Sequence, residues 1–241
     1  MNTFTASPVF GAGLTIMFYA AGLLLQKKVS WAHPLVTTCV GLMMTVKLMH
    51  IPLENYAVGG GIITYLLGPA VIALGVPVYK NGKKLSKSAV PLSVAIGVGS
   101  AVGMITAGFC AALMGAPKEF IASAVPKSVT TPIAMDIARQ LHGLPEIAAA
   151  MALVAGVIGN LVGPEILRFC GVKHDLAMGA AMGTSSHGFG TARLLKEHDL
   201  QASTASLAMA VAGMTVSALA MFVPWFLRMM AGHGWHGIHG S

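Results

Sequence analysis

Long apolar runs separated by short polar segments dominate the chain. They cover residues 9–25, 33–53, 62–79, 88–114, 145–169 and 202–230. An α-helix rises 1.5 Å per residue, so about 20 residues cross the hydrocarbon core of a bilayer. The runs therefore predict membrane-crossing helices. Because the connecting loops are short, we expect one membrane domain over residues 1–231, followed by a flexible glycine- and histidine-containing tail over residues 232–241.

The composition supports a membrane environment. Charged residues make up 10% of the 241 residues and hydrophobic residues 55%, whereas about 25% of the residues of a soluble domain are charged. This argues against an ordinary soluble enzyme and against a disordered chain. The net charge of +7 does not indicate a nucleic-acid partner, because the lysines form short clusters between apolar runs.

A different pattern marks residues 118–141, which are apolar at both ends and polar in the middle. Pro126 lacks a backbone N–H and disfavours helix at the preceding residue, so a first helix should end there. Thr131-Pro132 is a typical helix start, with Thr131 as the N-cap and Pro132 in the first helical position. The sequence therefore predicts two short helices with a polar break between them.

A second segment, residues 174–196, shows the same pattern. Gly183, Gly188 and Gly190 permit a break, because glycine adopts backbone conformations closed to other residues. We expect the break to contain residues 184–187 and the helix to restart near Thr191.

The two broken segments also suggest an internal repeat. The strings SAVPKSVTTPIA (123–134) and AMGTSSHGFGTA (181–192) align without gaps. They share an apolar stretch, a polar break and a restarting helix, and each follows a long apolar run. This pattern predicts a duplicated structural unit.

Basic residues set the expected orientation, because cytoplasmic loops carry an excess of Lys and Arg. We expect loops 27–28 and 80–87 to lie inside, which places both termini outside. Each broken segment either crosses the membrane once as a discontinuous helix or enters and leaves on the same side as a re-entrant hairpin. The expected fold class is an all-α polytopic membrane protein with about six to eight transmembrane helices and a transporter-like repeat.

The two breaks together suggest a binding site near mid-membrane, where non-helical backbone requires protein or water around it. Helix N-termini attract anions, hydroxyls donate hydrogen bonds, and Lys and Arg supply positive charge. A small organic carboxylate fits this set better than a cation does. His187 is a candidate proton carrier, because histidine titrates near neutral pH. The predicted substrate-binding residues are Lys127, Ser128, Thr130, Thr131, Thr184, Ser185, Ser186, His187, Thr191 and Arg193.

A structural role is the alternative for each of these side chains. Ser and Thr often join membrane helices, and Lys and Arg can extend to the interface. Two independent polar breaks in one small membrane protein nevertheless favour function, because they are costly to keep in lipid. Asp136 and Arg139, three residues apart, predict a local ion pair.

No sequence motif indicates an enzyme, a cofactor or a metal centre. GxSxG, HExxH, P-loop and GxGxxG motifs do not occur in the context that they need. The three cysteines form no CxxC pair, so neither a disulfide framework nor a zinc site is indicated. His233, His236 and His239 are better explained as part of a mobile tail than as metal ligands. We therefore expect a protein that is not an enzyme and has no cofactor.

Three stretches resemble the LrgB/CidB/YohK family: LLGPAVIALGVPVYKN (66–81), MGAPKEFIASAVPKSVTTPIAM (114–135) and AMGTSSHGFGTAR (181–193). The resemblance covers residues 10–230 and implies a multi-pass protein of the bacterial inner membrane, which would place both termini in the periplasm. Bacterial members are described as holin-like or antiholin-like proteins that affect murein hydrolase activity. Plant relatives resemble a fusion with a second part and carry glycolate and glycerate, and some bacterial members are linked to pyruvate movement.

Two functions follow as expectations. The first is a secondary transporter or exporter of small monocarboxylates, coupled to protons or another ion. The second is a holin-like or antiholin-like regulator of murein hydrolases that acts with a separate LrgA/CidA-type partner. The residues favour the transporter, because alternating access around a fixed site uses paired helix breaks and a pore does not. We also expect contact with the lipid bilayer, a homodimer and no nucleic-acid partner.

Overall fold

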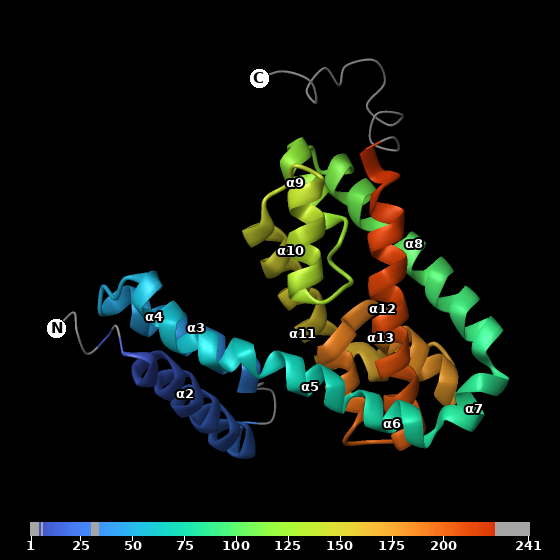
Figure 1. Cartoon of the computed structure of the whole chain (residues 1–241), viewed down its shortest axis with the longest axis horizontal. Coiled ribbons are helices and arrows are strands. Elements are labelled where there is room, and N and C mark those ends of the chain that lie inside the picture. Colours follow the sequence, from blue (N-terminus) through green and yellow to red (C-terminus); the bar gives the residue numbers. More distant parts are fainter. Residues whose placement is uncertain (1–4, 6, 30–33, 225–241) are drawn as a thin grey trace. The chain divides into compact units, whose positions relative to one another are not determined.

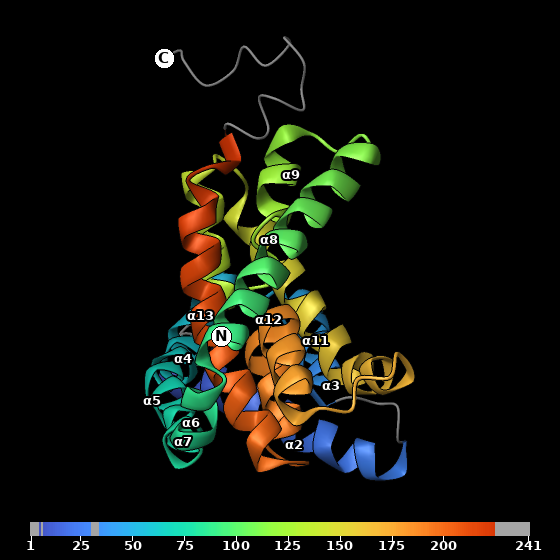
Figure 2. The same cartoon turned by 90° about the vertical axis from the view of Figure 1, so that its right-hand side faces the viewer.

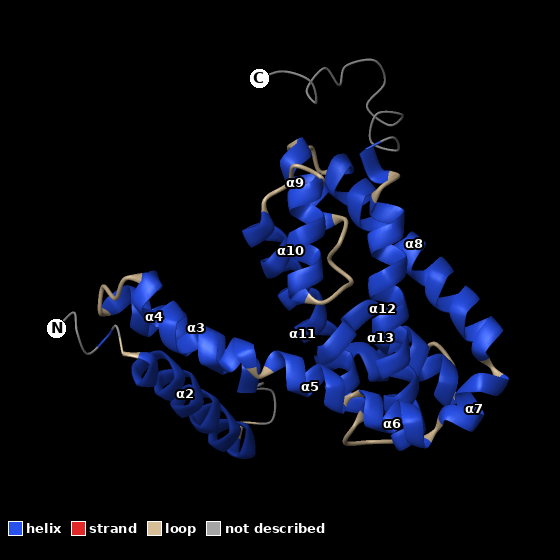
Figure 3. Ribbon diagram, viewed as in Figure 1, coloured by secondary structure: helices blue, strands red, loops and turns tan. Residues whose placement is uncertain are grey.

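The structure is a computed structural model that describes residue 5, residues 7–29 and residues 34–224. Every secondary-structure element in these described ranges is a helix (Figure 3). The chain forms two compact units, Met1–Leu74 and Gly75–Ser241, and each is described by itself. The expected tail, with its three histidines, lies outside the described residues.

The described residues of the first unit form the helices α2 (Pro8–Lys28), α3 (Pro34–Leu48), α4 (Leu53–Tyr65) and α5 (Leu67–Ala73). Helices α2 and α4 approach closely where Gly11 and Gly59 face each other, so that a Cβ at Gly59 would lie 2.6 Å from the Cα of Gly11. Thr15 Oγ1 and Tyr56 Oη form a hydrogen bond of 2.9 Å across the same pair. Small residues that let backbones meet are typical of helix pairs in membranes.

The second unit is built around three long helices. Its elements are α6 (Gly75–Lys80), α7 (Gly82–Lys87), α8 (Ala89–Leu113), α9 (Lys118–Ala124), α10 (Thr131–Gln140), α11 (Pro145–Phe169), α12 (Asp175–Leu194) and α13 (Asp199–Ala220). Helix α8 runs from the end that carries α7 to the end that carries α9, α11 runs back, and α13 returns in the direction of α8 (Figures 1 and 2). We call these the α7 end and the α9 end of the unit.

Helix α13 is tied to α6 at the α7 end. Asn81 Nδ2 donates a hydrogen bond to Ser203 Oγ at 2.7 Å, and the Ser203 hydroxyl contacts the Pro77 carbonyl oxygen at 2.9 Å. Helix α13 therefore begins where the lysine-rich segment 80–87 lies.

The first broken segment is a re-entrant hairpin, which we call hairpin 1 (residues 118–144). Helices α9 and α10 are its two arms, and residues 125–130 between them are not helical. The backbone N–H of Leu144 donates a hydrogen bond to Ser123 Oγ at 2.7 Å. A Cβ at Gly143 would lie 3.1 Å from the carbonyl oxygen of Glu119. The first arm therefore begins, and the second arm ends, at the α9 end of the unit.

The second broken segment is also a re-entrant hairpin, which we call hairpin 2 (residues 175–198). Its chain reverses at His187, where φ is 39° and ψ is −128° inside α12. The arms are antiparallel, because Gly190 packs on the backbone of Met182, and Leu194 shares an apolar cluster with Met178. Hairpin 2 enters and leaves at the α7 end.

The second unit thus repeats one motif in opposite directions. Helices α8 and α11 both have 25 residues, and each leads into a re-entrant hairpin. Hairpin 1 enters from the α9 end and hairpin 2 from the α7 end (Figure 1). The repeat expected from residues 123–134 and 181–192 is therefore present as an inverted pair, a form that many transporters share.

Hydropathy completes the fold assignment. Among the described residues, five helical stretches are long and apolar enough to cross a membrane: Pro8–Lys28, Leu53–Lys80, Ala89–Leu113, Pro145–Phe169 and Asp199–Ala220. The shorter helix Pro34–Leu48 is also apolar. The chain is therefore an all-α polytopic membrane protein, as the sequence predicts.

Candidate functional site

The tips of both hairpins rest on one glycine-containing face of α8. The Thr184 methyl carbon lies 3.5 Å from the position of a Cβ at Gly99, and Ser128 Oγ lies 3.4 Å from that of a Cβ at Gly103. Gly99 and Gly103 are four residues apart and therefore occupy successive turns of the same face. Helix α8 thus seats hairpin 2 on one turn and hairpin 1 on the next.

Helix α11 seats hairpin 2 in the same way. A Cβ at Gly156 would lie 2.9 Å from the His187 ring, and a Cβ at Gly159 would overlap the Ser186 side chain. Only a residue without a Cβ lets these side chains of hairpin 2 lie this close to the α11 backbone. The glycine spacing of α11 therefore fixes how deeply the tip of hairpin 2 lies.

Two cavities flank the hairpin tips. The α7-side cavity has a volume of about 400 Å³ and is lined from α8 and from the first arm of hairpin 2 by Ala95, Gly99, Gly103, Ala177, Ala180 and Ala181. The α9-side cavity has a volume of about 760 Å³ and is lined from α9 and α11 by Phe120, Glu146, Ile147, Ala150, Val154 and Ile158. Lys127 and Ser185 line both cavities. Volumes of this size accommodate a small organic molecule.

The tip of hairpin 2 is held by buried polar contacts. His187 Nε2 lies 3.1 Å from the Ala152 carbonyl oxygen, and the His187 ring meets Phe189 edge-on at a centroid distance of 5.5 Å. Asn160 Nδ2 donates to the Phe189 carbonyl oxygen at 2.6 Å. The Ala152 carbonyl oxygen can only accept, so this contact requires a proton on Nε2, and it orients the ring that orders the tip. His187 does not line either cavity.

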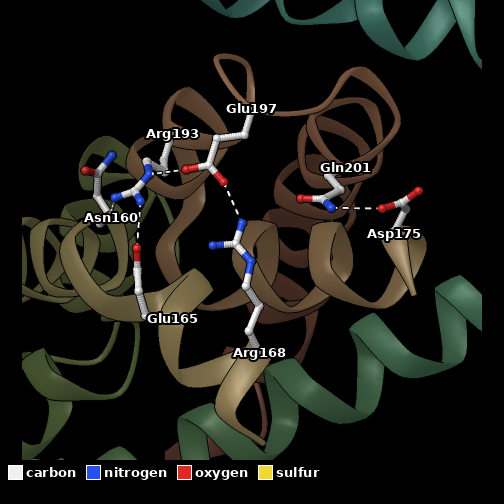
Figure 4. A network of polar contacts seen from close by, with 7 residues as sticks. All are labelled: Asn160, Glu165, Arg168, Asp175, Arg193, Glu197 and Gln201. Atoms are coloured by element: carbon white, nitrogen blue, oxygen red, sulfur yellow. Dashed lines mark hydrogen bonds and ion pairs between the residues drawn. The ribbon is translucent and has the colours of Figure 1, made fainter. Parts of the chain in front are cut away.

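Arg193 belongs to an ion-pair network at the α7 end (Figure 4). Its guanidinium contacts Glu165 at 2.7 Å and Glu197 at 2.5 Å, and it also donates to the Asn160 carbonyl oxygen at 3.0 Å. Glu197 in turn contacts Arg168 at 2.7 Å. The network binds the second arm of hairpin 2 to the end of α11.

The structure brings some of the predicted binding residues together and separates others. Those that line a cavity are Lys127, Ser128, Thr184, Ser185 and Ser186. Those that do not line either cavity are Thr130, Thr131, His187, Thr191 and Arg193. The Thr191 hydroxyl donates to the His187 carbonyl oxygen at 2.9 Å, so it braces the tip from within the hairpin.

The predicted helix boundaries at both breaks need correction. Thr130 is the N-cap of α10 and Thr131 its first residue, one position earlier than expected, and the Thr130 side chain makes no capping hydrogen bond. In hairpin 2, residues 184–186 are helical and the break is confined to His187. One residue with a positive φ therefore achieves the reversal that the glycines were expected to need. The predicted local pair is confirmed, with Arg139 2.7 Å from Asp136.

Two features of the site were missed by reasoning from the sequence. Ser100 is buried on α8, yet it appears in the sequence as one hydroxyl in a glycine-rich apolar run. Asn160 holds the hairpin 2 tip across 29 residues of chain. A polar amide in the middle of an apolar run is a signal for such a contact, but its partner is a backbone carbonyl and leaves no mark in the sequence.

Comparison with known proteins identifies the family. The profile of the LrgB-like family matches residues 15–227, and the chain belongs to this family. It is 33% identical over 218 residues to YxaC of Bacillus subtilis (strain 168), and the aligned region covers 90% of this chain and 95% of YxaC. It is 32% identical over 225 residues to the antiholin-like protein LrgB of Bacillus cereus (strain B4264), and the aligned region covers 92% of this chain and 98% of that protein. No solved structure matches the chain.

Proposed function

We propose that the chain is a secondary transporter of small monocarboxylates of the glycolate, glycerate or pyruvate class, with the two hairpin tips as its substrate site. The observation that carries this proposal is that Lys127 and Ser185 line both cavities, one on the α7 side and one on the α9 side of the tips. Alternating access needs one site that can be reached from either side of the membrane. The transport substrate passes through the protein unchanged, so the proposal includes no enzymatic step.

The charge balance of the cavities supports a monoanion as the substrate. Among the described residues that line them, Lys127 is the sole cation and Glu146 the sole anion. Glu146 lies in the first turn of α11, at the outer part of the α9-side cavity, and Lys127 lies at the tips. A lone ammonium at membrane depth is costly without a counter-charge, and one carboxylate supplies it. The Ser128 hydroxyl adds a neutral hydrogen-bond donor, whereas the Ser185 hydroxyl donates to the Ala181 carbonyl oxygen at 2.8 Å and lies 3.1 Å from Ser186 Oγ.

We also propose that the α7 end faces the cytoplasm of a bacterial inner membrane. Among the described Lys and Arg residues outside the hairpin tips of the second unit, those at the α7 end are Lys80, Lys83, Lys84, Lys87, Arg168, Lys173, Arg193 and Lys196. Those at the α9 end are Lys118 and Arg139. This asymmetry follows the positive-inside rule, and α13 then ends on the periplasmic side.

A second candidate function is favoured by the names of relatives. Several similar proteins of Bacillus cereus are named antiholin-like protein LrgB. An antiholin-like role would make this chain a regulator of murein hydrolases that acts with a separate LrgA/CidA-type membrane partner. The family match speaks for this role more directly than for transport, whereas the paired hairpins and shared cavities speak for transport.

Counterflow in proteoliposomes separates the two functions. Purified protein is reconstituted with unlabelled glycolate or pyruvate inside, and entry of the labelled compound is measured. We expect counterflow with the wild type and its loss with Lys127→Ala, while Lys173→Ala, a loop variant, retains it. No counterflow of either compound, together with an altered autolysis rate in cells that express the protein, would favour the antiholin-like role. Light scattering of the same preparation tests the proposed homodimer.

A further inference from the structure

Hydroxyls in the helices of this protein commonly bond to the carbonyl four residues earlier. Ser206 Oγ, for example, donates to the Ala202 carbonyl oxygen at 2.9 Å. Among the described residues, Ser100 Oγ and Thr184 Oγ1 are buried without any hydrogen-bond partner. Ser100 is 1% exposed and Thr184 8% exposed. A third such atom, Gln201 Oε1, belongs to an amide that bonds Asp175 through its nitrogen. Buried hydroxyls without partners are rare and call for an explanation.

Ser100 and Thr184 lie at the same level of the second unit. Ile96 and Ala180 pack in one apolar cluster, and Ser100 and Thr184 each follow one helical turn later. Helix α8 and the first arm of hairpin 2 both run from the α7 end, so each of these turns leads toward the tips. The contact of Thr184 with Gly99, which precedes Ser100, places the two hydroxyl-bearing turns side by side.

The surroundings of Thr184, which lines the α7-side cavity, suit a monovalent cation; Ser100 follows the lining residue Gly99 but does not itself line the cavity. The first arm of hairpin 2 ends at His187, so the negative end of its helix dipole points at the tip region. Half-helix ends and unwound carbonyls of this kind bind Na⁺ in other transporters. The residues described as lining the α7-side cavity include no carboxylate. Divalent cations generally use carboxylate ligands, so neutral oxygens favour a singly charged ion.

We propose that Ser100 Oγ and Thr184 Oγ1 are ligands of a sodium ion that is bound together with the substrate. This inference rests on the proposed transport function, for which it names the coupling ion. Thr184 and Lys127 line the same cavity, so sodium and the Lys127 ammonium repel each other when the substrate is absent. A carboxylate between them attracts both charges. Sodium and substrate therefore bind with positive cooperativity, and each raises the affinity for the other.

Uptake and binding in the intact chain test the proposal. Uptake of labelled glycolate and of labelled pyruvate into proteoliposomes is measured against sodium concentration, with choline as the replacement ion. We expect sodium dependence in the wild type, and Ser100→Ala and Thr184→Val should raise the half-maximal sodium concentration by about tenfold. Thr184→Ser, which keeps the hydroxyl, should restore it. Ser206→Ala is the matched control, because its buried hydroxyl bonds only within α13.

A direct binding measurement keeps the two proposals separate. Binding of radioactive sodium to the purified protein is measured with and without pyruvate or glycolate, after size-exclusion chromatography shows that each variant is folded. Transport that depends on Lys127 but is equal in sodium and choline would overturn the sodium site and leave the transport function standing. If the wild type binds sodium, Thr184→Val abolishes this binding and the wild type transports neither compound, the sodium site would stand and the transport function would be overturned. Sodium binding that Ser100→Ala and Thr184→Val leave unchanged would also overturn the site.

Discussion

The Ser123 hydroxyl accepts a hydrogen bond of 2.7 Å from the backbone N–H of Leu144, which lies 21 residues further along the chain. The same hydroxyl donates to the Glu119 carbonyl oxygen at 2.6 Å, and Ser123 is fully buried. One side chain thus joins the first arm of hairpin 1 to the residue that precedes α11. This contact is what makes residues 118–144 a hairpin that returns to its side of entry.

Ser123→Ala should therefore destabilise the second unit. The change leaves the Leu144 N–H without its partner, and a buried unpaired donor costs about 1–3 kcal/mol. Thermal unfolding of the detergent-purified protein measures the effect. Ser217→Ala is the control, because the Ser217 hydroxyl bonds only to the Gly213 carbonyl oxygen of its own helix. Equal melting temperatures for the two variants would contradict the role assigned to Ser123.

Gly159→Ala should displace the tip of hairpin 2. The added Cβ would overlap the Ser186 side chain, and overpacking of this kind costs about 1–3 kcal/mol. Combining it with Ser186→Gly should recover part of the loss, because the clashing side chain is then removed. Gly97→Ala on α8 meets nothing within 4 Å and should be neutral. A double variant no more stable than Gly159→Ala would show that the contact does not position the tip.

Lys127→Ala should weaken carboxylate binding more than Ser186→Ala does. Hydrogen bonds to charged groups contribute about 1.5–3 kcal/mol and neutral ones about 0.5–1.5 kcal/mol. These energies correspond to roughly ten- to hundredfold in affinity for Lys127 and up to about tenfold for Ser186. Transport at sub-saturating substrate measures both changes. Wild-type rates from the two variants would remove the basis of the hairpin site.

Stability should depend on pH through the Glu197 carboxylate. Burial raises the pKa of Glu197, but the hydrogen bonds and charges of Arg193 and Arg168 outweigh burial and hold it below its ordinary value of 4.5. A depressed pKa stabilises the folded state above the unfolded value, and this stabilisation is lost as the pH falls through the folded value. Glu197→Gln should melt below the wild type at neutral pH, and the difference should shrink in acid. A difference that does not change with pH would contradict the network.

Accessibility of single cysteines tests the orientation. Cys39, Cys110 and Cys170 are replaced first, and one cysteine is then introduced at Lys83 or at His142. An impermeant reagent added to intact cells should label position 142 and leave position 83 unlabelled, because the α7 end is expected in the cytoplasm. The opposite labelling pattern would invert the proposed orientation.

The sequence was sufficient to predict the first break in detail, because its causes are local, whereas it placed the second break over residues 184–187 and the structure confines it to His187. Pro126 ends one helix and the threonine–proline pair begins the next, and both effects act within a few residues. Whether a broken segment crosses or returns depends instead on contacts such as that of Gly190 with Met182. These contacts are made by backbone and small residues, so hydropathy does not reveal them.

The site was predictable only in part for the same reason. Lys127 and Ser185 reach the cavities from positions that the break pattern indicated. Arg193 was also among the predicted binding residues, since it follows the second break closely. Its partner Glu165 is 28 residues away in the chain. Only the tertiary structure shows that Glu165 and Glu197 both form ion pairs with the Arg193 guanidinium. The role of Arg193 is thus decided in part by Glu165, a partner that the local sequence does not contain.

The shortness of the hairpin arms has a consequence for synthesis at the membrane. Helix α9 has 7 residues and α10 has 10, whereas about 20 are needed to cross a bilayer. An arm that leaves the translocation channel alone would carry its polar tip into hydrocarbon. Gly179 and Gly183 of hairpin 2 pack on the backbone of Gln201 and Ala205 in α13, and α13 leaves the ribosome after them. Hairpin 2 must therefore be sheltered until α13 has been made, so its fold in the membrane is completed only once α13 has been translated.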